Sequence, residues 1–514
     1  MFRFSHPTAV FALLSAVSVL MAAGCAVGPD YVKPTVPTSA DFKENRFQDK
    51  DGHDWKQAQP QDMIAKGNWW EVFHDSQLDQ FEREAETNNP DLKAAVDRVT
   101  EERATARVAQ AEFFPNLDLD PTATRTRISP NGAVSIFSSA LGGGGASAAP
   151  AGAGPTVPNF GKSAITFNDY RIPFDLSYEV DLWGRVRRNF EEARAQAEAS
   201  QADYENVLLT LKADVALDYF NLRDLDEQRR IARQTVDYRR HSLDLYTRRL
   251  QVGMENELTI SQAETELRDA EQQAQSLDQS RAKIEHALAI LLGRNPADFN
   301  LRENATNRAS PSIPVGLPSE VLERRPDVAE AERRMIAANA QIGVAKAAFF
   351  PVLRLTGDAG YESVRTSDLF DWPSRIFSLG PSVSFPVFEG GQNTAKLKSA
   401  HAAYDEALNN YREQVLQAFQ QVEDSLSDIH YLALQIETET KAAQASARSA
   451  DLAHRQFDAG SITFLTVVDT DRSALANQLT LSQLEGQKIA ATVQLIKALG
   501  GGWQDSKLLT GAGH

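Results

Sequence analysis

The stretch FDLSYEVDLWG, residues 174 to 184, places an apolar side chain at every second position. The alternation runs back from Leu182 to Tyr170, and the residues between are mostly charged or polar. This period of two predicts a β-strand whose two faces meet different surroundings. Residues 185 to 252 then contain neither Gly nor Pro, which predicts a helix far longer than an ordinary globular one. Any fold for this chain must therefore explain what covers the apolar face of the strand.

The chain contains two related halves. Residues 89 to 117 align without gaps to residues 325 to 353, and residues 174 to 293 align to residues 381 to 500. Each half therefore offers a helix, two strands and a long helical pair. The extra length of the first half lies in residues 139 to 158, whose Gly, Ala, Ser and Pro content predicts a mobile loop.

Four strands are expected, at about residues 116 to 127, 166 to 182, 352 to 363 and 377 to 388. Each reaches the roughly 9 to 11 residues that a membrane β-strand needs. The helices supply no broad apolar face to cover a sheet, so lipid is the expected cover. Four strands cannot close around a channel, and open edges in lipid are costly, so two, three or more chains must share a barrel.

A Phe-Phe-Pro motif stands at the helix-to-strand junction of each half. The aromatic rings would lie at the lipid headgroups, and each proline would end its helix. The junction residues are Phe113, Phe114, Pro115, Phe349, Phe350 and Pro351.

The long helical segments predict two hairpins. Residues 392 to 459 also lack Gly and Pro, so each first segment would extend roughly 100 Å at a rise of 1.5 Å per residue. Gly253 and Gly460 follow these segments, and a second segment of about 60 Å follows each glycine. Apolar residues from Tyr404 to Ile436 recur at spacings of three and four, which predicts a coiled-coil seam. The fold class is mainly α with transmembrane β.

Residues 1 to 24 combine a short basic start, an apolar stretch and small residues before Cys25, as an export signal does. Small residues directly before the sole cysteine resemble a bacterial lipoprotein signal, in which the cysteine is acylated. Cys25 would then carry a diacylglycerol and an N-acyl chain, palmitate among them. The alternative is an ordinary secretory signal with a cysteine nearby by chance.

Composition excludes several classes of function. The chain has 53 basic and 70 acidic residues, and this acidic balance argues against nucleic acid as a partner. No zinc motif or nucleophile elbow occurs, and the GKS at residues 161 to 163 lacks the earlier glycine of a phosphate loop, since residue 156 is Thr. No enzyme, cofactor or metal site is therefore expected. The rival interpretation is a non-conducting coiled-coil scaffold or adhesin of the envelope.

Several motifs resemble the TolC-like family of outer-membrane efflux channels, in its lipoprotein branch (NodT-type) serving RND pumps. They are CAVGPDYVKP (25 to 34), WWEVFHDSQLDQF (69 to 81), NPDL (89 to 92), LERRPDVAEAERRMIAANAQIGVAKAAFFP (322 to 351) and AGSITFLTVVDTDRSAL (459 to 475). The resemblance implies a homotrimer with a shared 12-stranded barrel above a periplasmic helical tunnel. It also implies outer-membrane lipid, a periplasmic adaptor protein and an inner-membrane RND-type pump as partners.

The resemblance also gives the domain boundaries. They are a signal peptide (1–24), a lipid-anchored segment with part of an equatorial belt (25–85), a first efflux repeat (86–293), a linker (294–318), a second repeat (319–500) and a tail (501–514).

In the family, carboxylates just after the second hairpin turn narrow the pore. Asp469 matches one such position, with Arg472 one helical turn further on. The other position holds Thr466, and Thr259 in the first half. Three Asp469 carboxylates around one axis would repel one another and attract cations. Without the resemblance, Asp469 would be interpreted as a solvated helix charge paired with Arg472.

Overall fold

The computed structural model of the chain describes residues 26–35, 43, 67–129, 165–304, 311 and 324–501. Cys25 with the signal segment, the loop at 139 to 158 and the residues after 501 lie outside the described residues. The described part is mainly helical. None of its helices is both long and apolar enough to cross a membrane.

The chain forms two compact units. One unit comprises residues 1–30, 106–191 and 339–401, and it holds the β-sheet. The other comprises residues 31–105, 192–338 and 402–514, and it holds the helical hairpins.

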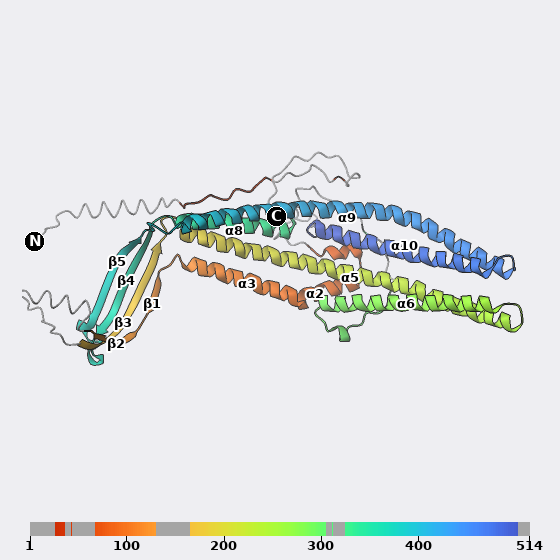
Figure 1. The fold of residues 1–514 in the computed structure, drawn as a ribbon, viewed down its shortest axis with the longest axis horizontal. Coiled ribbons are helices and arrows are strands. Elements are labelled where there is room, and N and C mark those ends of the chain that lie inside the picture. Colours follow the sequence, from red (N-terminus) through yellow and green to blue (C-terminus); the bar gives the residue numbers. More distant parts are fainter. Residues whose placement is uncertain are drawn as a thin grey trace, which may run out of the picture. The chain divides into compact units, whose positions relative to one another are not determined.

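The helices of the two halves match in length. Three helices of 22, 67 and 35 residues occur in the first half, and helices of the same lengths occur in the second (Figure 1). The first set is α3 (Pro90–Ala111), α5 (Arg185–Gln251) and α6 (Glu257–Leu291), and the second is α8 (Pro326–Ala347), α9 (Gln392–Asp458) and α10 (Phe464–Ala498). The two long helices end within one residue of the Gly- and Pro-free runs in the sequence, because no residue inside them interrupts the backbone ladder.

One antiparallel sheet is present, and its first predicted strand is interrupted. The strands are β1 (Asn116–Leu119), β2 (Thr122–Ile128), β3 (Ile165–Val180), β4 (Val352–Ser363) and β5 (Arg375–Ser384). Both β1 and β2 pair with β3, which pairs with β4, which pairs with β5. The break falls at Asp120 and Pro121, and Pro121 has no backbone N–H to donate to the ladder. β5 begins two residues earlier than expected and ends at Ser384 rather than at residue 388.

The register places the apolar residues on one face of the sheet. Phe174 of β3 stands opposite Leu119 on one side and Ala359 on the other, and Ala359 stands opposite Phe377 of β5. Paired residues of antiparallel strands point to the same face. Phe377 is 78% exposed and Phe174 is 50% exposed, so the described residues leave these two rings largely uncovered. The opposite face carries charged residues, among them an ion pair between Arg171 and Asp358 at 3.0 Å.

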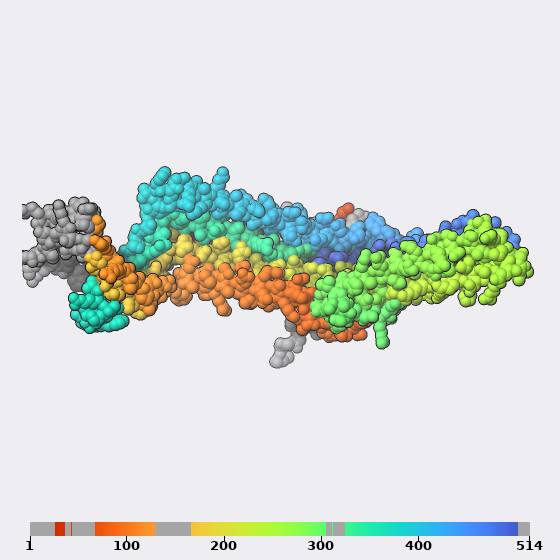
Figure 2. Space-filling model, turned by 60° about the horizontal axis from the view of Figure 1, so that its bottom comes forward, coloured from red at the N-terminus to blue at the C-terminus, as the bar shows by residue number. Residues whose placement is uncertain are grey.

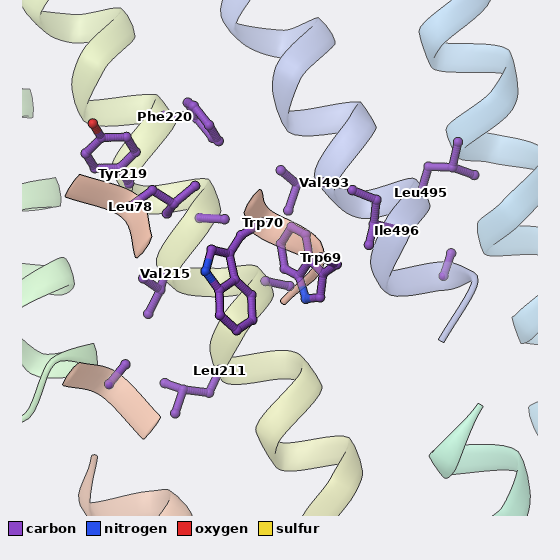
Figure 3. Close-up of a cluster of buried hydrophobic side chains, with 14 of the residues drawn as sticks. Trp69, Trp70, Leu78, Leu211, Val215, Tyr219, Phe220, Val493, Leu495 and Ile496 are labelled. Carbon is purple, nitrogen blue, oxygen red and sulfur yellow. The ribbon is translucent and has the colours of Figure 1, made fainter. Parts of the chain in front are cut away.

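Helices that are far apart in sequence lie side by side in the second unit. Figure 2 shows α3 in orange along α5 in yellow, and Arg98 of α3 pairs with Asp203 of α5 at 3.2 Å. A short 3-10 helix η1 (Trp69–Phe73) and α2 (Ser76–Asn88) pack against α5 through the largest buried cluster. In Figure 3, Trp70 lies beside Val215 and Leu211 of α5, and Trp69 lies toward Ile496 of α10. Burying such a ring contributes on the order of 3 kcal/mol.

Residues 301 to 304, within the predicted linker, are held by buried charges. Arg281 of α6 donates to the carbonyl of Leu301 at 2.6 Å, and its Nε donates to Asp226 of α5 at 2.7 Å. Asp226 also accepts from the backbone N–H of Asn304 at 3.2 Å. The arginine therefore joins both helices of the first hairpin to the chain that leaves it.

The N-terminal residues 26 to 30 are fastened to the sheet-containing unit. The N–H of Val27 donates to the carbonyl of Trp183 at 2.9 Å, and Arg188 pairs with Asp30 at 2.7 Å. Gly28 approaches Gly343 of α8 so closely that a Cβ on Gly28 would lie 2.6 Å from the Gly343 Cα. A side chain at Gly28 would push the segment off the helix, whereas a Cβ at Gly343 would lie 2.7 Å from Cγ of Arg188.

Candidate functional site

The predicted turn residues end both long helices. Gly253 has φ +75° and Gly460 has φ +73°, in the left-handed region that glycine adopts without strain. After α5, the N–H of Gly253 donates to Leu250 and that of Met254 to Arg249, and the same two bonds follow α9. This pattern is a Schellman motif, in which the last helical carbonyls are satisfied before the chain reverses.

An aromatic cluster joins the two hairpins beside these turns. The ring of Tyr246 on α5 lies 5.6 Å from Phe457 on α9 and 4.9 Å from Phe464 on α10, with both pairs close to perpendicular. Val467 and Val468 of α10 complete the buried cluster. In the motif FLTVV (464 to 468), Phe464, Val467 and Val468 thus pack α10 against the first hairpin, while Leu465 and Thr466 are exposed.

The four predicted constriction residues differ in exposure. Asp469 and Thr466 are exposed on α10, whereas Thr259 is buried at the start of α6. The N–H of Thr259 donates to the side chain of Asn256, which caps that helix. The hydroxyls of Thr466 and Thr463 lie 3.3 Å apart. The exposed residues Asp469 and Thr466 therefore both belong to the second hairpin.

Arg472 pairs across the hairpins and not with Asp469. Its guanidinium donates to both carboxylate oxygens of Glu266 on α6, with Nε at 3.2 Å from Oε2. Arg239 of α5 approaches the same carboxylate at 3.1 Å and donates to the carbonyl of Glu266 at 2.6 Å. Among the ion pairs of the described residues, none involves Asp469. Glu266 and Arg239 are both nearly fully buried, so their pair is shielded from solvent, whereas the side chain of Arg472 is 54% exposed.

A second polar contact across the hairpins was not predicted. Tyr238 of α5 meets His454 of α9, which in turn meets Asp471 of α10. Tyr238 and Arg239 are neighbours in sequence, as are Asp471 and Arg472, so both contacts depend on how α5 packs against α10. The spacing of apolar residues along each helix does not predict how one helix is rotated against another.

Each aromatic junction packs one ring and exposes the other, but the packed ring is the first phenylalanine in the first half and the second phenylalanine in the second half. Phe113 packs on Phe190 at 5.7 Å, whereas Phe114 is 67% exposed. In the second half, Phe350 stacks on Trp183 at 4.7 Å, and the indole N–H of Trp183 donates to the carbonyl of Pro351 at 2.7 Å. Phe349 is 38% exposed. Helices α3 and α8 end four residues before Pro115 and Pro351, respectively.

The described ranges contain no group of three or more His, Cys, Asp or Glu side chains arranged to hold a metal ion. The polar groups near the turns are instead engaged with one another across helices. Their arrangement suits a mechanical role, in which contacts between helices are made and broken.

Comparisons with known proteins agree with this architecture. The family model described as outer membrane efflux protein matches residues 83–294 and 317–501. A pyoverdine export outer membrane protein, OpmQ of Pseudomonas aeruginosa, is 32% identical over 85% of this chain and 88% of its own length. A toluene efflux pump outer membrane protein, TtgI of Pseudomonas putida, is 30% identical over 97% of this chain and 99% of its own length. The solved structure of the outer-membrane channel OprN matches with a TM-score of 0.76 and 27% identity, covering 93% of this chain and 100% of that one.

Proposed function

The chain belongs to the outer membrane efflux protein family, and from this premise we propose that three copies form one channel with a shared 12-stranded barrel. It is an outer-membrane component of an efflux system, and the members of its family are channels and not enzymes. Each chain would contribute four strand positions, of which β1 and β2 together occupy one and β3, β4 and β5 occupy the other three. The helical hairpins would continue as a periplasmic tunnel.

The exposed apolar face of the sheet carries the proposal of a shared barrel. Phe377, Leu379 and Val383 of β5 are each more than 60% exposed in the single chain. Leaving such side chains in water costs roughly 2 kcal/mol each, a cost that lipid removes. Within the described residues, β5 pairs only with β4, and β1 and β2 pair only with β3. Unpaired edges in hydrocarbon cost several kcal/mol per backbone group, and neighbouring copies would pair them.

We also propose that Cys25 is acylated. The residues directly after it support this, because Ala26 and Val27 contact Gly184 and Trp183 at the end of β3, where the sheet meets the helix. A lipid on Cys25 would therefore start close to the level of the aromatic junctions. Cys25→Ser is expected to abolish metabolic labelling with fatty acid, and label that persists in this variant would refute acylation at this residue.

The second hairpin turn is proposed as the periplasmic constriction, with Asp469 as the acidic ring. Its support is the exposure of Asp469 and the engagement of Arg472 with Glu266, so that no ion pair among the described residues holds the Asp469 carboxylate. Three such carboxylates would favour cations in the closed state.

Planar-bilayer recordings of the purified protein test channel and constriction together. Asp469→Ala is expected to raise the conductance and to weaken the preference for cations. Gln262→Ala is the matched control, because Gln262 lies nine residues after Gly253 as Asp469 lies nine after Gly460. Unchanged current and selectivity in Asp469→Ala would remove the constriction assignment. No current from the unmodified protein would instead favour the scaffold or adhesin.

The partners proposed are a periplasmic adaptor and an inner-membrane pump of the RND type. The support is the family membership and the names of relatives, one of which is the outer membrane protein of a toluene efflux pump. The neighbouring genes should encode both partners, and their absence there would count against this part of the proposal.

A further inference from the structure

Three titratable side chains from three helices meet between the hairpins. His454 Nε2 on α9 lies 2.9 Å from Asp471 Oδ1 on α10. The hydroxyl of Tyr238 on α5 lies 2.7 Å from His454 Nε2 and 3.0 Å from Nδ1. His454 is the middle member, so its protonation state affects the contact within the second hairpin and the contact to the first.

This group is partly shielded from solvent, and Tyr238 is its most exposed member at 47%. The side chains of His454 and Asp471 are 24% and 23% exposed, respectively. Tyr238, His454 and Asp471 line one small cavity together with Glu266, so the contact described above and this one share a single packed region. Polar contacts there are less screened by solvent than contacts on the outer surface.

Other charged groups near His454 are mostly acidic or already paired. Asp451 and Asp458 flank it on α9 and favour its protonated form. Arg455 pairs with Asp451 at 2.7 Å, and Arg249 of α5 pairs with Asp458 at 3.0 Å. From the remaining elements, the groups that line the cavity are Tyr246 and Arg239 of α5, Glu266 of α6 and Asp471 of α10.

We propose that His454 is a pH-sensitive clasp between the two hairpins, which tightens when the imidazole is protonated and loosens when it is neutral. In the protonated ring, Nε2 donates to the Asp471 carboxylate, and the Tyr238 oxygen lies within 3.0 Å of both ring nitrogens, beside the positive charge. Such charge-assisted hydrogen bonds are about twice as strong as neutral ones. If the hairpins form the proposed constriction, the clasp would hold it shut in acid, and in this respect the inference rests on the proposed function.

The direction of the pH effect follows from linkage. The hydrogen bond with Asp471 raises the pKa of His454 above its ordinary value of 6.5, although burial acts to lower it. The protonated form is therefore favoured by the clasped state. The stabilisation of the clasped state by protonation is complete below about pH 6.5 and is lost as the pH rises through the raised pKa of His454. Because the pKa differs between the clasped and open states, the ratio of the two states depends on pH.

Hydrogen exchange of the purified full-length protein tests the clasp without relying on conduction. At pH 6, amides of α5 and α9 around residues 238 and 454 should exchange at least about threefold more slowly in the unmodified protein than in His454→Gln. At pH 8.5 the two proteins should exchange equally. Comparison at one pH removes the intrinsic pH dependence of exchange.

Two further variants keep the test decisive. Asp471→Asn should also remove the difference between acid and alkaline pH, because the ion pair is lost while the shape is kept. His430→Gln, on the same helix, should behave like the unmodified protein. A pH dependence that survives in both His454→Gln and Asp471→Asn would overturn the clasp.

Bilayer current gives the functional readout. The closed-to-open ratio of the unmodified protein should fall at least about threefold between pH 6 and 8, and that of His454→Gln should not change. A protein that conducts no current but shows the exchange difference would refute the channel and keep the clasp. A current that varies with pH equally in both proteins would refute the clasp as a control of opening.

Discussion

The two hairpin turns have nearly the same backbone but different side chains. Both glycines adopt the same left-handed conformation, and both turns form the same pair of hydrogen bonds. The first turn leads into a helix capped by the side chain of Asn256, whereas Thr463 makes no side-chain cap for α10. One glycine at the right position therefore determines the reversal, whatever chemistry the following helix carries.

The side chains of the two hairpins are complementary. The second hairpin carries the aspartate, arginine and histidine of the polar contacts, at His454, Asp471 and Arg472. The first hairpin supplies their partners, Tyr238 and Glu266. Related halves have thus kept one backbone, while the links Tyr238–His454 and Glu266–Arg472 each join one hairpin to the other and exist only when both are packed together.

The largest effect should come from removing the carboxylate that both arginines share. Glu266→Ala leaves the buried Arg239 without its ion pair, and breaking such a pair costs about 3 kcal/mol. Hydrogen exchange should report this as a loss in the opening free energy of α6 and α10. Glu264→Ala removes an exposed carboxylate two residues away, which pairs with the exposed Arg268, and should cost less than about 0.5 kcal/mol. Equal losses would mean that the contact does not hold the hairpins together.

Replacing the glycine of either turn should cause a smaller loss of stability, equal at the two turns. Gly460→Ala and Gly253→Ala each force a Cβ into the left-handed region, at a cost of about 1 to 2 kcal/mol. No atom lies within 4 Å of the Cβ position at either glycine, so backbone strain is the whole effect. The opening free energies of the two hairpins, measured by hydrogen exchange, should fall alike. A loss at only one turn would show that packing, which differs between the hairpins, contributes there.

Much of the architecture could be predicted from local pattern. The long helices begin at Arg185 and Gln392 and end two residues before Gly253 and Gly460, because helix ends depend on nearby residues. Alternation located β3 and β4 closely for the same reason. The interruption of the first strand at Pro121 could have been expected from its missing N–H. The early end of β5 at Ser384 was not visible in its apolar pattern, which continues to Phe388.

The candidate site was less accessible to sequence reasoning. The turn glycines were identified by position, and their conformation agrees with that role. Arg472 was considered only with its near neighbour Asp469, whereas its partner Glu266 lies 206 residues away. Such pairs depend on the rotation of one helix against another, which a single sequence leaves open. The assignment of Asp469 to a pore stays a prediction, since a single chain has no axis around which to arrange it.

The contacts of residues 27 to 30 determine where a pull on the preceding chain is first resisted. A pull on the chain ahead of Val27 meets the carbonyl of Trp183 first, then the Asp30 carboxylate held by Arg188. The glycine contact between residues 28 and 343 adds a close-fitting stop against sliding. A lipid on Cys25, as proposed, would therefore load these contacts at the start of α5 first.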